Sequence, residues 1–240
     1  MRYGSIPAGG LGSRLGPTGF SKELLPVGER AAIDHLIDRM LAGGIDRVFV
    51  NTAADKQDLI RYLACQSPFG RYCVFLVRER RGLLDGVVQP AQFLRDDDEL
   101  YFGLPDTLWF PHDAFQAIVA HPGLLVLGLF DSGTPERFDA VSTTDDGRIQ
   151  AVDVKVSNPP TKWTWGIGKL RVSEVARLRA LAAARDIDTP FGAVVHDYAQ
   201  SYPAYAVSFA ESAYLDLGTR GDYARASDFL ASGGRCSTVT

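Results

Sequence analysis

The segment Pro7-Ala-Gly-Gly-Leu-Gly-Ser-Arg-Leu-Gly-Pro-Thr-Gly-Phe-Ser-Lys-Glu-Leu-Leu-Pro-Val-Gly28 says most about the fold and chemistry of this chain. It follows a short apolar stretch, where an α/β protein places its first strand and phosphate-binding loop. Glycines have no Cβ atom, so the backbone can turn tightly and bring bare N–H groups close to anionic oxygens, while nearby cations neutralise further charge. The glycines are Gly9, Gly10 and Gly12, and the cations are Arg14 and Lys22. The segment therefore predicts a polyphosphate-binding loop after a first strand.

Two better-known glycine motifs are excluded. A P-loop requires Gly-x-x-x-x-Gly-Lys-Ser/Thr, and the chain contains no such run. A dinucleotide-binding fingerprint requires Gly-x-Gly-x-x-Gly and an acidic residue at the end of the second strand. The run from Gly10 to Gly16 has one residue too many, and the expected second strand ends in Asn51-Thr52. The loop must therefore belong to another class of phosphate-binding protein.

Helical and strand patterns alternate along the chain, which predicts an α/β fold of three layers, with a mostly parallel central sheet flanked by helices. We expect strands at residues 2–6, 45–51, 72–78, 99–106 and 123–130, and helices at residues 31–43, 56–65, 82–94 and 111–120. Pro90 should kink or split the third of these helices. Short strands with turn signals follow at residues 138–170, then helices at 172–184 and 191–200 and strands at 205–209 and 214–217. A capping box from Thr219 to Asp222 begins the last helix.

Length and composition agree with one enzyme-sized domain. With 240 residues, 46% of them hydrophobic, the chain can bury a substantial core. We expect a single domain at residues 1–240, with a first half at 1–135, a small β-rich part at 136–218 and a C-terminal helix and tail at 219–240.

Charge and cysteine content exclude several classes of protein. A formal net charge of −4 argues against a nucleic-acid-binding surface, which would need a basic patch. No apolar run approaches the roughly 20 residues of a membrane span, and the start of the chain leads directly into the loop without a signal peptide. Cys65, Cys73 and Cys236 form neither a disulfide framework nor a zinc set. These features predict a cytoplasmic protein that does not bind nucleic acid or membranes.

The residues of the loop resemble the signature of the sugar-1-phosphate nucleotidyltransferases. That signature is a Gly-Gly-x-Gly-Thr/Ser-Arg-Leu loop and then a Lys shortly before Leu-Leu-Pro-Val/Ile. It is matched by residues 8–15 and 21–27 of this chain. The Ser21-Lys22 pair is most similar to the glucose-1-phosphate thymidylyltransferase branch. The resemblance extends from residue 3 to about residue 231 and implies the Rossmann-like nucleotidyltransferase fold with a small β-rich sugar-binding part. It also implies that residues 1–135 are the nucleotide-binding half and residues 136–218 the sugar-phosphate-binding half.

In the reaction that the resemblance implies, a sugar phosphate oxygen attacks the α-phosphorus of a nucleoside triphosphate and pyrophosphate leaves. Two anions must meet, so catalysis should consist mostly of positioning and electrostatic stabilisation. Arg14 is expected to stabilise the developing charge and the departing pyrophosphate, and Lys22 to reach the phosphates from the other side. The residues expected to bind the nucleotide are Ala8, Gly9, Gly10, Gly12, Ser13 and Gly82.

The resemblance also implies a Mg²⁺ site. The family uses an aspartate at the end of a central strand and a second aspartate near the C-terminus, which match Asp106 and Asp216. The flanking residues Leu104-Pro105 depart from the Gly-Asp-Asn or Gly-Asp-Asp of many relatives, but the aspartate is retained. Two carboxylates, with water and phosphate oxygens completing six ligands, are typical of Mg²⁺.

Selection of the base and the sugar is less clearly marked. Gly82 fits a backbone approach to the nucleobase, but the glutamine that reads the base in relatives is absent from residues 77–86. Thymine and uracil share one hydrogen-bonding edge, so dTTP and UTP both remain open. On the sugar side relatives have a Glu-Lys-Pro segment and then a Gly-aromatic strand. Their nearest matches are Asp153, a stand-in for the glutamate, together with Lys155 and Gly166.

The sequence thus predicts an enzyme that condenses dTTP or UTP with a sugar 1-phosphate to an NDP-sugar and pyrophosphate, and that requires Mg²⁺. Three questions stay open. Trp163 and Trp165 can stack on the sugar or pack the β-rich part. Nucleotidyl transfer to a non-sugar phosphorylated acceptor, with CTP or another triphosphate, and a catalytically silent nucleotide-binding regulator are the alternative functions. Homo-oligomerisation is also left open.

Overall fold

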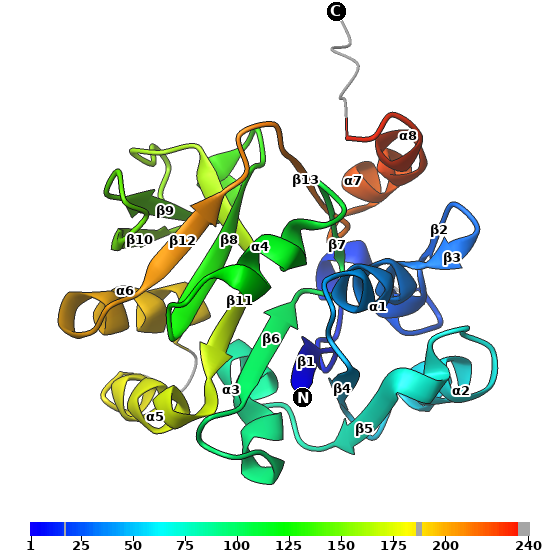
Figure 1. Cartoon of the computed structure of the whole chain (residues 1–240). Helices are drawn as coiled ribbons and strands as arrows, with labels where there is room; N and C mark the ends of the chain where they lie inside the picture. Colours follow the sequence, from blue (N-terminus) through cyan, green and yellow to red (C-terminus); the bar gives the residue numbers. More distant parts are fainter. Residues whose placement is uncertain (17, 186–188, 235–240) are drawn as a thin grey trace, which may run out of the picture.

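A ladder of parallel strands forms one half of the central sheet. The structure is a computed structural model that describes residues 1–16, 18–185 and 189–234. Strand β1 (Arg2–Pro7) pairs in parallel with β4 (Arg47–Thr52) on one side and with β6 (Glu99–Gly103) on the other, and β4 pairs with β5 (Cys73–Val77) (Figure 1). The carboxyl ends of all four strands therefore lie along one edge, and the glycine-rich loop leaves β1 at this edge.

The other half of the sheet is mixed. Strand β11 (Trp163–Arg171) runs antiparallel to β6 and continues the sheet to β8 (Leu125–Asp131) and β9 (Asp139–Thr143). Strand β10 (Ile149–Val154) borders β9, and β12 (Tyr205–Ser208) pairs in parallel with β8. Among the described residues these strands and the parallel ladder make one nine-stranded sheet. The strands of the β-rich part thus extend the central sheet.

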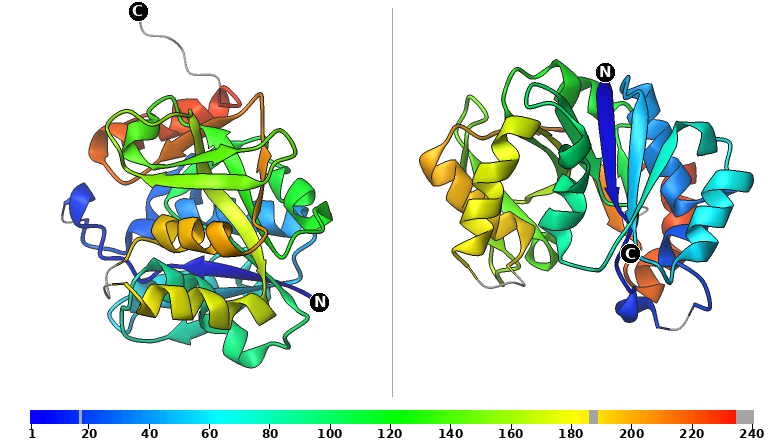
Figure 2. Two further views of the ribbon diagram at one scale, coloured as in Figure 1. Left: turned by 90° about the vertical axis from the view of Figure 1, so that its left-hand side faces the viewer. Right: turned by 90° about the horizontal axis from the view of Figure 1, so that it is seen from below.

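Helices cover both faces of this sheet, which confirms the predicted three-layer α/β fold (Figure 2). Helices α1 (Ala32–Ala42), α2 (Gln57–Cys65) and α4 (Ala114–Ala120) contribute to one hydrophobic cluster, which contains Tyr101 of β6. Helices α3 (Leu83–Val88), α5 (Val175–Ala183) and α6 (Phe191–Ser201) contribute to a second cluster, which contains Leu100 and Phe102. Neighbouring side chains on a strand point to opposite faces, so Tyr101 enters one core layer, and Leu100 and Phe102 enter the other.

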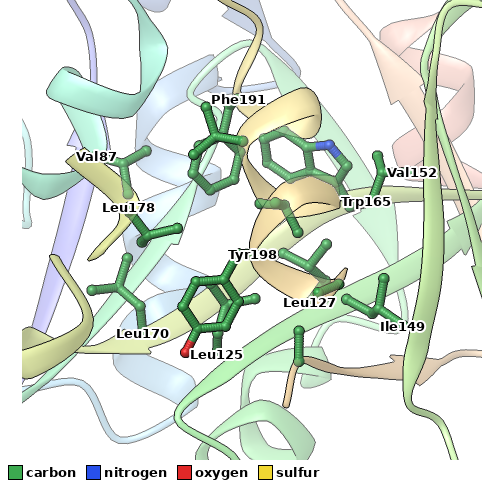
Figure 3. Close-up of a cluster of buried hydrophobic side chains, with 14 of the residues drawn as sticks. Val87, Leu125, Leu127, Ile149, Val152, Trp165, Leu170, Leu178, Phe191 and Tyr198 are labelled. Carbon is green, nitrogen blue, oxygen red and sulfur yellow. The ribbon is translucent and has the colours of Figure 1, made fainter. Parts of the chain in front are cut away.

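The second hydrophobic cluster packs helix α6 against strand β11. Figure 3 shows Phe191 of α6 beside Trp165 of β11, with Tyr198 further along the helix and aliphatic side chains from β8 and β10 around them. The rings of Trp165 and Phe191 lie 5.1 Å apart in an edge-to-face arrangement, which favours a fixed indole orientation.

A small sheet and a third cluster stand apart from the main sheet. Strand β7 (Thr107–Phe110) pairs antiparallel with β13 (Ala213–Asp216), and β2 (Pro26–Val27) forms a hairpin with β3 (Arg30–Ala31). The sequence predicts β13 but not β7, because the expected strand ends at Asp106 and leaves residues 107–110 unassigned. Helices α7 (Arg220–Ala224) and α8 (Ala226–Ala231) pack on this region, where the sequence predicted one helix.

Several local predictions are confirmed. Helix α3 ends at Val88, and a 3₁₀ helix, Gln89–Phe93, begins at the expected break before Pro90. The Thr219 side chain accepts a hydrogen bond from the Asp222 N–H, as the capping box predicts. The other 3₁₀ helices are Ser13–Leu15, Lys22–Leu24, Gly70–Tyr72, Pro135–Arg137 and Val172–Glu174.

Two further expectations can be set against the described residues. None of the described helices is long and apolar enough to cross a membrane. Cys65 and Cys73 are free thiols, whereas Cys236 lies outside the described part of the chain. The division of the domain near residue 135 stays a prediction, because β6 and β11 join the two parts within one sheet.

Candidate active site

The glycine-rich loop closes around the side chain of Lys22. Its start is fixed to the sheet, because the Ala8 N–H donates to the Asn51 carbonyl at 2.8 Å. Gly12 has a φ of 70°, a left-handed conformation that favours glycine. A Cβ atom on Gly12 would lie 3.2 Å from Cδ of Lys22, and one on Gly10 would lie 3.5 Å from its Nζ. The glycines therefore also let the loop pack against the lysine stem.

Lys22 forms an ion pair with Asp106 at the carboxyl end of β6. Nζ donates to Oδ2 at 2.5 Å, and the two side chains are only 17% and 12% exposed. Burial by itself would raise the pKa of Asp106, but the Lys22 ammonium outweighs it and the pKa is lowered. Burial would lower the pKa of Lys22, yet the carboxylate of Asp106 raises it. Both groups are thus held in their charged forms.

Asp216 brings a second carboxylate to this point. The pairing of β13 with β7 places Asp216 opposite Thr107, next to Asp106 in the chain, and the Gly218 N–H donates to its Oδ1 at 2.9 Å. Burial and then the charge of Asp106 raise the pKa of Asp216. Arg14 lies 3.7 Å away, but its side chain is 65% exposed, so this ion pair is weak. The two carboxylates share a site whose negative charge is incompletely balanced.

This carboxylate pair fits the metal that the sequence implies. Mg²⁺ usually takes one or two carboxylates and completes its octahedral shell with water and substrate phosphate oxygens. Burial, and next the charge of Asp106, raise the pKa of Asp216, and a bound divalent cation would favour its ionised form. Within residues 1–16, 18–185 and 189–234 no three His, Cys, Asp or Glu side chains are grouped so as to hold a metal. Asp106 and Asp216 could therefore hold Mg²⁺ together with substrate oxygens.

The first cavity opens at the carboxyl ends of β1 and β4 and has a volume of about 350 Å³. Gly82, with a φ of 84°, begins α3 beside it, and Gly86 lets this helix pack on β1, since a Cβ atom there would lie 2.9 Å from Cβ of Pro7. The Asn51 amide donates to the Gly86 carbonyl at 2.7 Å and so ties β4 to α3. The residues around the cavity include Pro7, Gly9, Gly10, Lys22, Gly82 and Asp106.

Two arginines after β5 stiffen the wall of the first cavity. Arg80 donates through Nε to the Gly9 carbonyl at 2.6 Å and through Nη2 to the Asp55 carboxylate at 2.6 Å, so it holds the glycine loop in place. Arg78 pairs with Asp85 of α3. No local pattern in the sequence indicates the contact between Arg80 and Gly9.

The second cavity lies on the other side of Asp106 and has a volume of about 380 Å³. The residues around it include Arg14, Arg137, Asp139, Lys155, Trp165 and Asp216. It shares Gly82, Leu83, Leu104 and Asp106 with the first cavity. The two cavities therefore meet at Asp106, where the cations and carboxylates are gathered.

The predicted sugar-side residues are divided by the structure. Lys155 borders the second cavity, and its backbone N–H donates to the Phe138 carbonyl at 3.0 Å. Asp153 and Gly166 are not among the described residues that line this cavity. A Cβ atom on Gly166 would lie 2.5 Å from Cε2 of Tyr214, so this glycine makes room for a ring that does line the cavity. Of the two tryptophans, Trp165 lines the cavity and also packs in the core.

The predicted nucleotide-side residues are divided as well. Gly9, Gly10 and Gly82 line the first cavity. Ala8 is fully buried at the end of β1. Gly12 and Ser13, where the loop turns into a 3₁₀ helix, lie outside the described linings of both cavities.

Arg137 is a cation at the second cavity that the sequence did not reveal. It donates to both oxygens of Asp222, at 2.5 Å and 3.3 Å. Thr219 and Arg225 also donate to Asp222, each at 2.6 Å. The hydrogen bond from Arg137, with these further donors, holds the pKa of Asp222 well below its usual range. The guanidinium is thus fixed at the cavity by a capping residue 85 positions away, a contact that no local pattern predicts.

Comparison with known proteins agrees with this geometry. Residues 4–233 match the nucleotidyl transferase family. A glucose-1-phosphate thymidylyltransferase of Neisseria meningitidis is 29% identical over 171 residues, which are 67% of this chain and 58% of the relative. A mannose-1-phosphate guanylyltransferase of Mycobacterium tuberculosis is 26% identical over 238 residues, which are 95% of this chain and 64% of the relative. The chain thus spans about three fifths of the length of the curated relatives that it matches.

Solved structures show the same fold at lower identity. A Bacillus anthracis protein assigned as a glucose-1-phosphate thymidylyltransferase, in complex with sucrose, has a TM-score of 0.81 at 20% identity and covers 100% of this chain and 98% of its own. A UDP-glucose pyrophosphorylase complexed with UDP-glucose has a TM-score of 0.79 at 16% identity and covers 97% and 99%. Both likenesses establish the Rossmann-like fold of this chain.

Proposed function

Because this chain belongs to the nucleotidyl transferase family, we propose that it condenses a nucleoside triphosphate with a sugar 1-phosphate to give an NDP-sugar and pyrophosphate. The observation that carries the proposal is the meeting of two cavities at Asp106, each large enough for one substrate. The triphosphate would lie in the first cavity against the Gly9–Gly10 backbone. The sugar phosphate would lie in the second, with its phosphate among Arg14, Arg137 and Asp216.

In the reaction, an oxygen of the sugar phosphate forms a bond to the α-phosphorus, and the bond from this phosphorus to the bridging oxygen of pyrophosphate breaks. The acceptor is already an anion, so the protein need not remove a proton from it. Its task is to hold two anions in line and to balance their charge. A site at the junction of the two cavities meets this requirement.

Lys22 and Arg14 would divide the electrostatic work. Lys22 is buried and charged, and its Nζ lies near the glycine loop, so it would contact the triphosphate oxygens from within the protein. Arg14 is exposed, pairs only weakly with Asp216 and borders the second cavity, so its planar guanidinium would bind the acceptor phosphate and the charge that develops there, rather than the departing pyrophosphate that the sequence predicts. Mg²⁺, held by Asp106 and Asp216, would supply neutralisation of the phosphate charge when bound.

For the base we propose dTTP or UTP. The backbone at Gly82 and the wall formed by α3 would approach the base edge, which thymine and uracil share. One relative acts on glucose 1-phosphate as a thymidylyltransferase and another on mannose 1-phosphate as a guanylyltransferase, so GTP is the competing choice that an experiment must include.

The test is pyrophosphate release from dTTP, UTP, GTP, CTP and ATP, each with a panel of sugar 1-phosphates and with Mg²⁺. We expect release with a sugar 1-phosphate and with dTTP or UTP, and no release when either substrate is omitted. Release only with another phosphorylated acceptor would contradict the sugar assignment. Tight triphosphate binding without release from any pair would indicate a silent binding protein instead.

A further inference from the structure

A carboxylate at the far wall of the second cavity takes no part in the chemistry described above. Asp139, the first residue of β9, lines the cavity. The indole Nε1 of Trp165 donates to its Oδ2 at 3.2 Å, and the backbone of Gly192 in the first turn of α6 lies against the carboxylate. A Cβ atom on Gly192 would lie 2.3 Å from Oδ2, so the carboxylate reaches this helix only because a glycine is there. Asp139 is therefore held in one position.

The strand register separates Asp139 from the acidic residue that the sequence favoured. Asp139 pairs across the ladder with Val154, and Asp153 is the next residue along β10. Neighbouring side chains on a strand point to opposite faces. Asp139 and Val152 both lie against Gly192 of α6, so they face the same layer and Asp153 faces away from it. Only Asp139 of this pair of acids borders the second cavity.

Two polar groups near this wall, the Asp139 carboxylate and the Thr164 hydroxyl, have unfilled hydrogen-bonding positions among the described residues. A carboxylate has about four acceptor positions, and the indole of Trp165 fills one of them. Burial raises the pKa of Asp139, as expected for a carboxylate with few donors. Thr164, also in the lining, is fully buried, and its hydroxyl has no hydrogen-bond partner among the described residues. The carboxylate of Asp139 therefore has acceptor positions left for a ligand in the second cavity.

The second cavity is also lined by cations. Arg14 and Arg137 suit a phosphate, and the charge of Lys155 offsets part of the effect of burial, which raises the pKa of Asp139. The indole of Trp165 and the ring of Phe191 form an apolar wall beside the carboxylate. A cavity that combines cations with an acceptor beside aromatic rings fits a phosphorylated sugar ring.

We propose that Asp139 is a specificity-determining residue, which accepts hydrogen bonds from ring hydroxyl groups of the sugar phosphate. The substrate class is then a 1-phosphate of a hydroxylated ring, and acceptors without hydroxyl donors at this wall are rejected. The inference rests on the proposed function, because it assigns the ligand of the same second cavity. It adds a residue and a recognition chemistry that the position of Asp153 in the sequence did not suggest.

The experiment measures pyrophosphate release for the wild type and Asp139→Asn, with the best sugar 1-phosphate and with its series of monodeoxy analogues. Asparagine keeps the shape and one acceptor, so the contacts to Trp165 and Gly192 are partly preserved. We expect the KM for the sugar phosphate to rise about 10- to 100-fold, as for the loss of charge-assisted hydrogen bonds. The kcat and the KM for the triphosphate should change less than about 3-fold. Asp153→Asn, one residue from the matching register position, is the control and should change neither KM.

The analogues separate recognition from a purely structural role in capping α6. With the wild type, at least one deoxy analogue should lower kcat/KM about as much as the Asp139→Asn substitution lowers it for the full sugar phosphate. With the Asp139→Asn variant, the same analogue should lower kcat/KM little further. The proposal would be overturned if every analogue lowered kcat/KM of the variant by the same factor as that of the wild type. It would also be overturned if Asp139→Asn left the KM for the sugar phosphate unchanged. If the variant does not fold, the analogues can still be measured with the wild type. The proposal would be overturned if each of them lowered kcat/KM by less than about 3-fold. A wild type that releases no pyrophosphate with any sugar 1-phosphate would instead contradict the proposed function itself.

Discussion

The first cavity is formed at the carboxyl ends of adjacent parallel strands, whereas the second is assembled from β7, β9, β11, β13 and α6. In the first, the glycine loop, Lys22 and Gly82 come from the opening third of the chain and keep their geometry through backbone turns. In the second, Arg137, Asp139 and Asp216 come from segments that meet only in the folded protein. The difference teaches that a phosphate loop can be identified from its sequence, while an acceptor pocket depends on strand register.

The two cavities also differ in how their charges are held. Lys22 in the first is neutralised by Asp106 within the site, so its partner is part of the chemistry. Arg137 in the second is held by Asp222, a helix-capping residue outside the lining. Substitutions should therefore affect the whole reaction on one side and only acceptor binding on the other.

The largest effect is expected from Lys22→Ala. This change removes a buried cation from the triphosphate loop and leaves Asp106 buried without its ion-pair partner. We expect kcat/KM in the pyrophosphate-release assay to fall about 1,000-fold, comparable to the loss of a strong electrostatic contact to the transition state. Lys162→Ala, at an exposed lysine paired with Asp131, is the control and should retain nearly full activity. A fall of less than about 10-fold for Lys22→Ala would remove this residue from the reaction.

Arg137→Gln should produce the next largest effect, confined to the acceptor. Losing one charge-assisted phosphate contact should raise the KM for the sugar phosphate about 10- to 100-fold, with the KM for the triphosphate nearly unchanged. Arg225→Gln is a matched control, because Arg225 also donates to Asp222 but is not in the described lining of the second cavity. Equal increases in both KM values would contradict the separation of the two cavities.

A smaller effect concerns how the second cavity is packed. Gly166→Ala would place a Cβ atom 2.5 Å from the Tyr214 ring, and such overpacking typically costs about 1–3 kcal/mol of unfolding free energy. Gly221→Ala is the comparison, since no atom lies within 4 Å of a Cβ atom there and helix α7 should tolerate alanine. Urea unfolding of the two variants measures the difference. Equal stabilities would show that Tyr214 has room to move.

The smallest effect expected is a pH dependence at the anchor of Arg137. The pKa of Asp222 is lower in the folded protein than the usual value of about 3.9, so the anchored carboxylate stabilises the fold at neutral pH. This contribution declines as the pH falls below about 4 and Asp222 becomes protonated. Thermal unfolding between pH 3 and pH 7 should therefore give a steeper acid decline for the wild type than for Asp222→Asn. Parallel curves would show that the anchor contributes little.

The sequence predicted the fold and the first cavity because both depend on local patterns. Helix α1 follows an apolar stripe, and the capping residue Thr219 begins α7 where expected. Gly9, Gly10 and Lys22 lie in one motif, so their proximity follows from a single turn of the chain. Asp106 ends up with them because parallel strands deliver their carboxyl ends to one edge.

The rest of the site could not be predicted for physical reasons. The side chains of Asp153 and Asp139 lie on opposite faces of the sheet. This difference depends on the register between β9 and β10, which the sequence does not show. Arg137 acquires its place through Asp222, far along the chain, and β7 exists because β13 pairs with it. Such long-range partners leave no periodic signal in the segments that they join.

The most direct test of the central claim is a crystal structure with the NDP-sugar formed from the most active substrate pair. The account predicts the nucleoside in the first cavity beside Gly82, the sugar in the second cavity beside Trp165, and the diphosphate passing Asp106 between them. A nucleoside seated against Trp165, or a product bound wholly on one side of Asp106, would contradict the account.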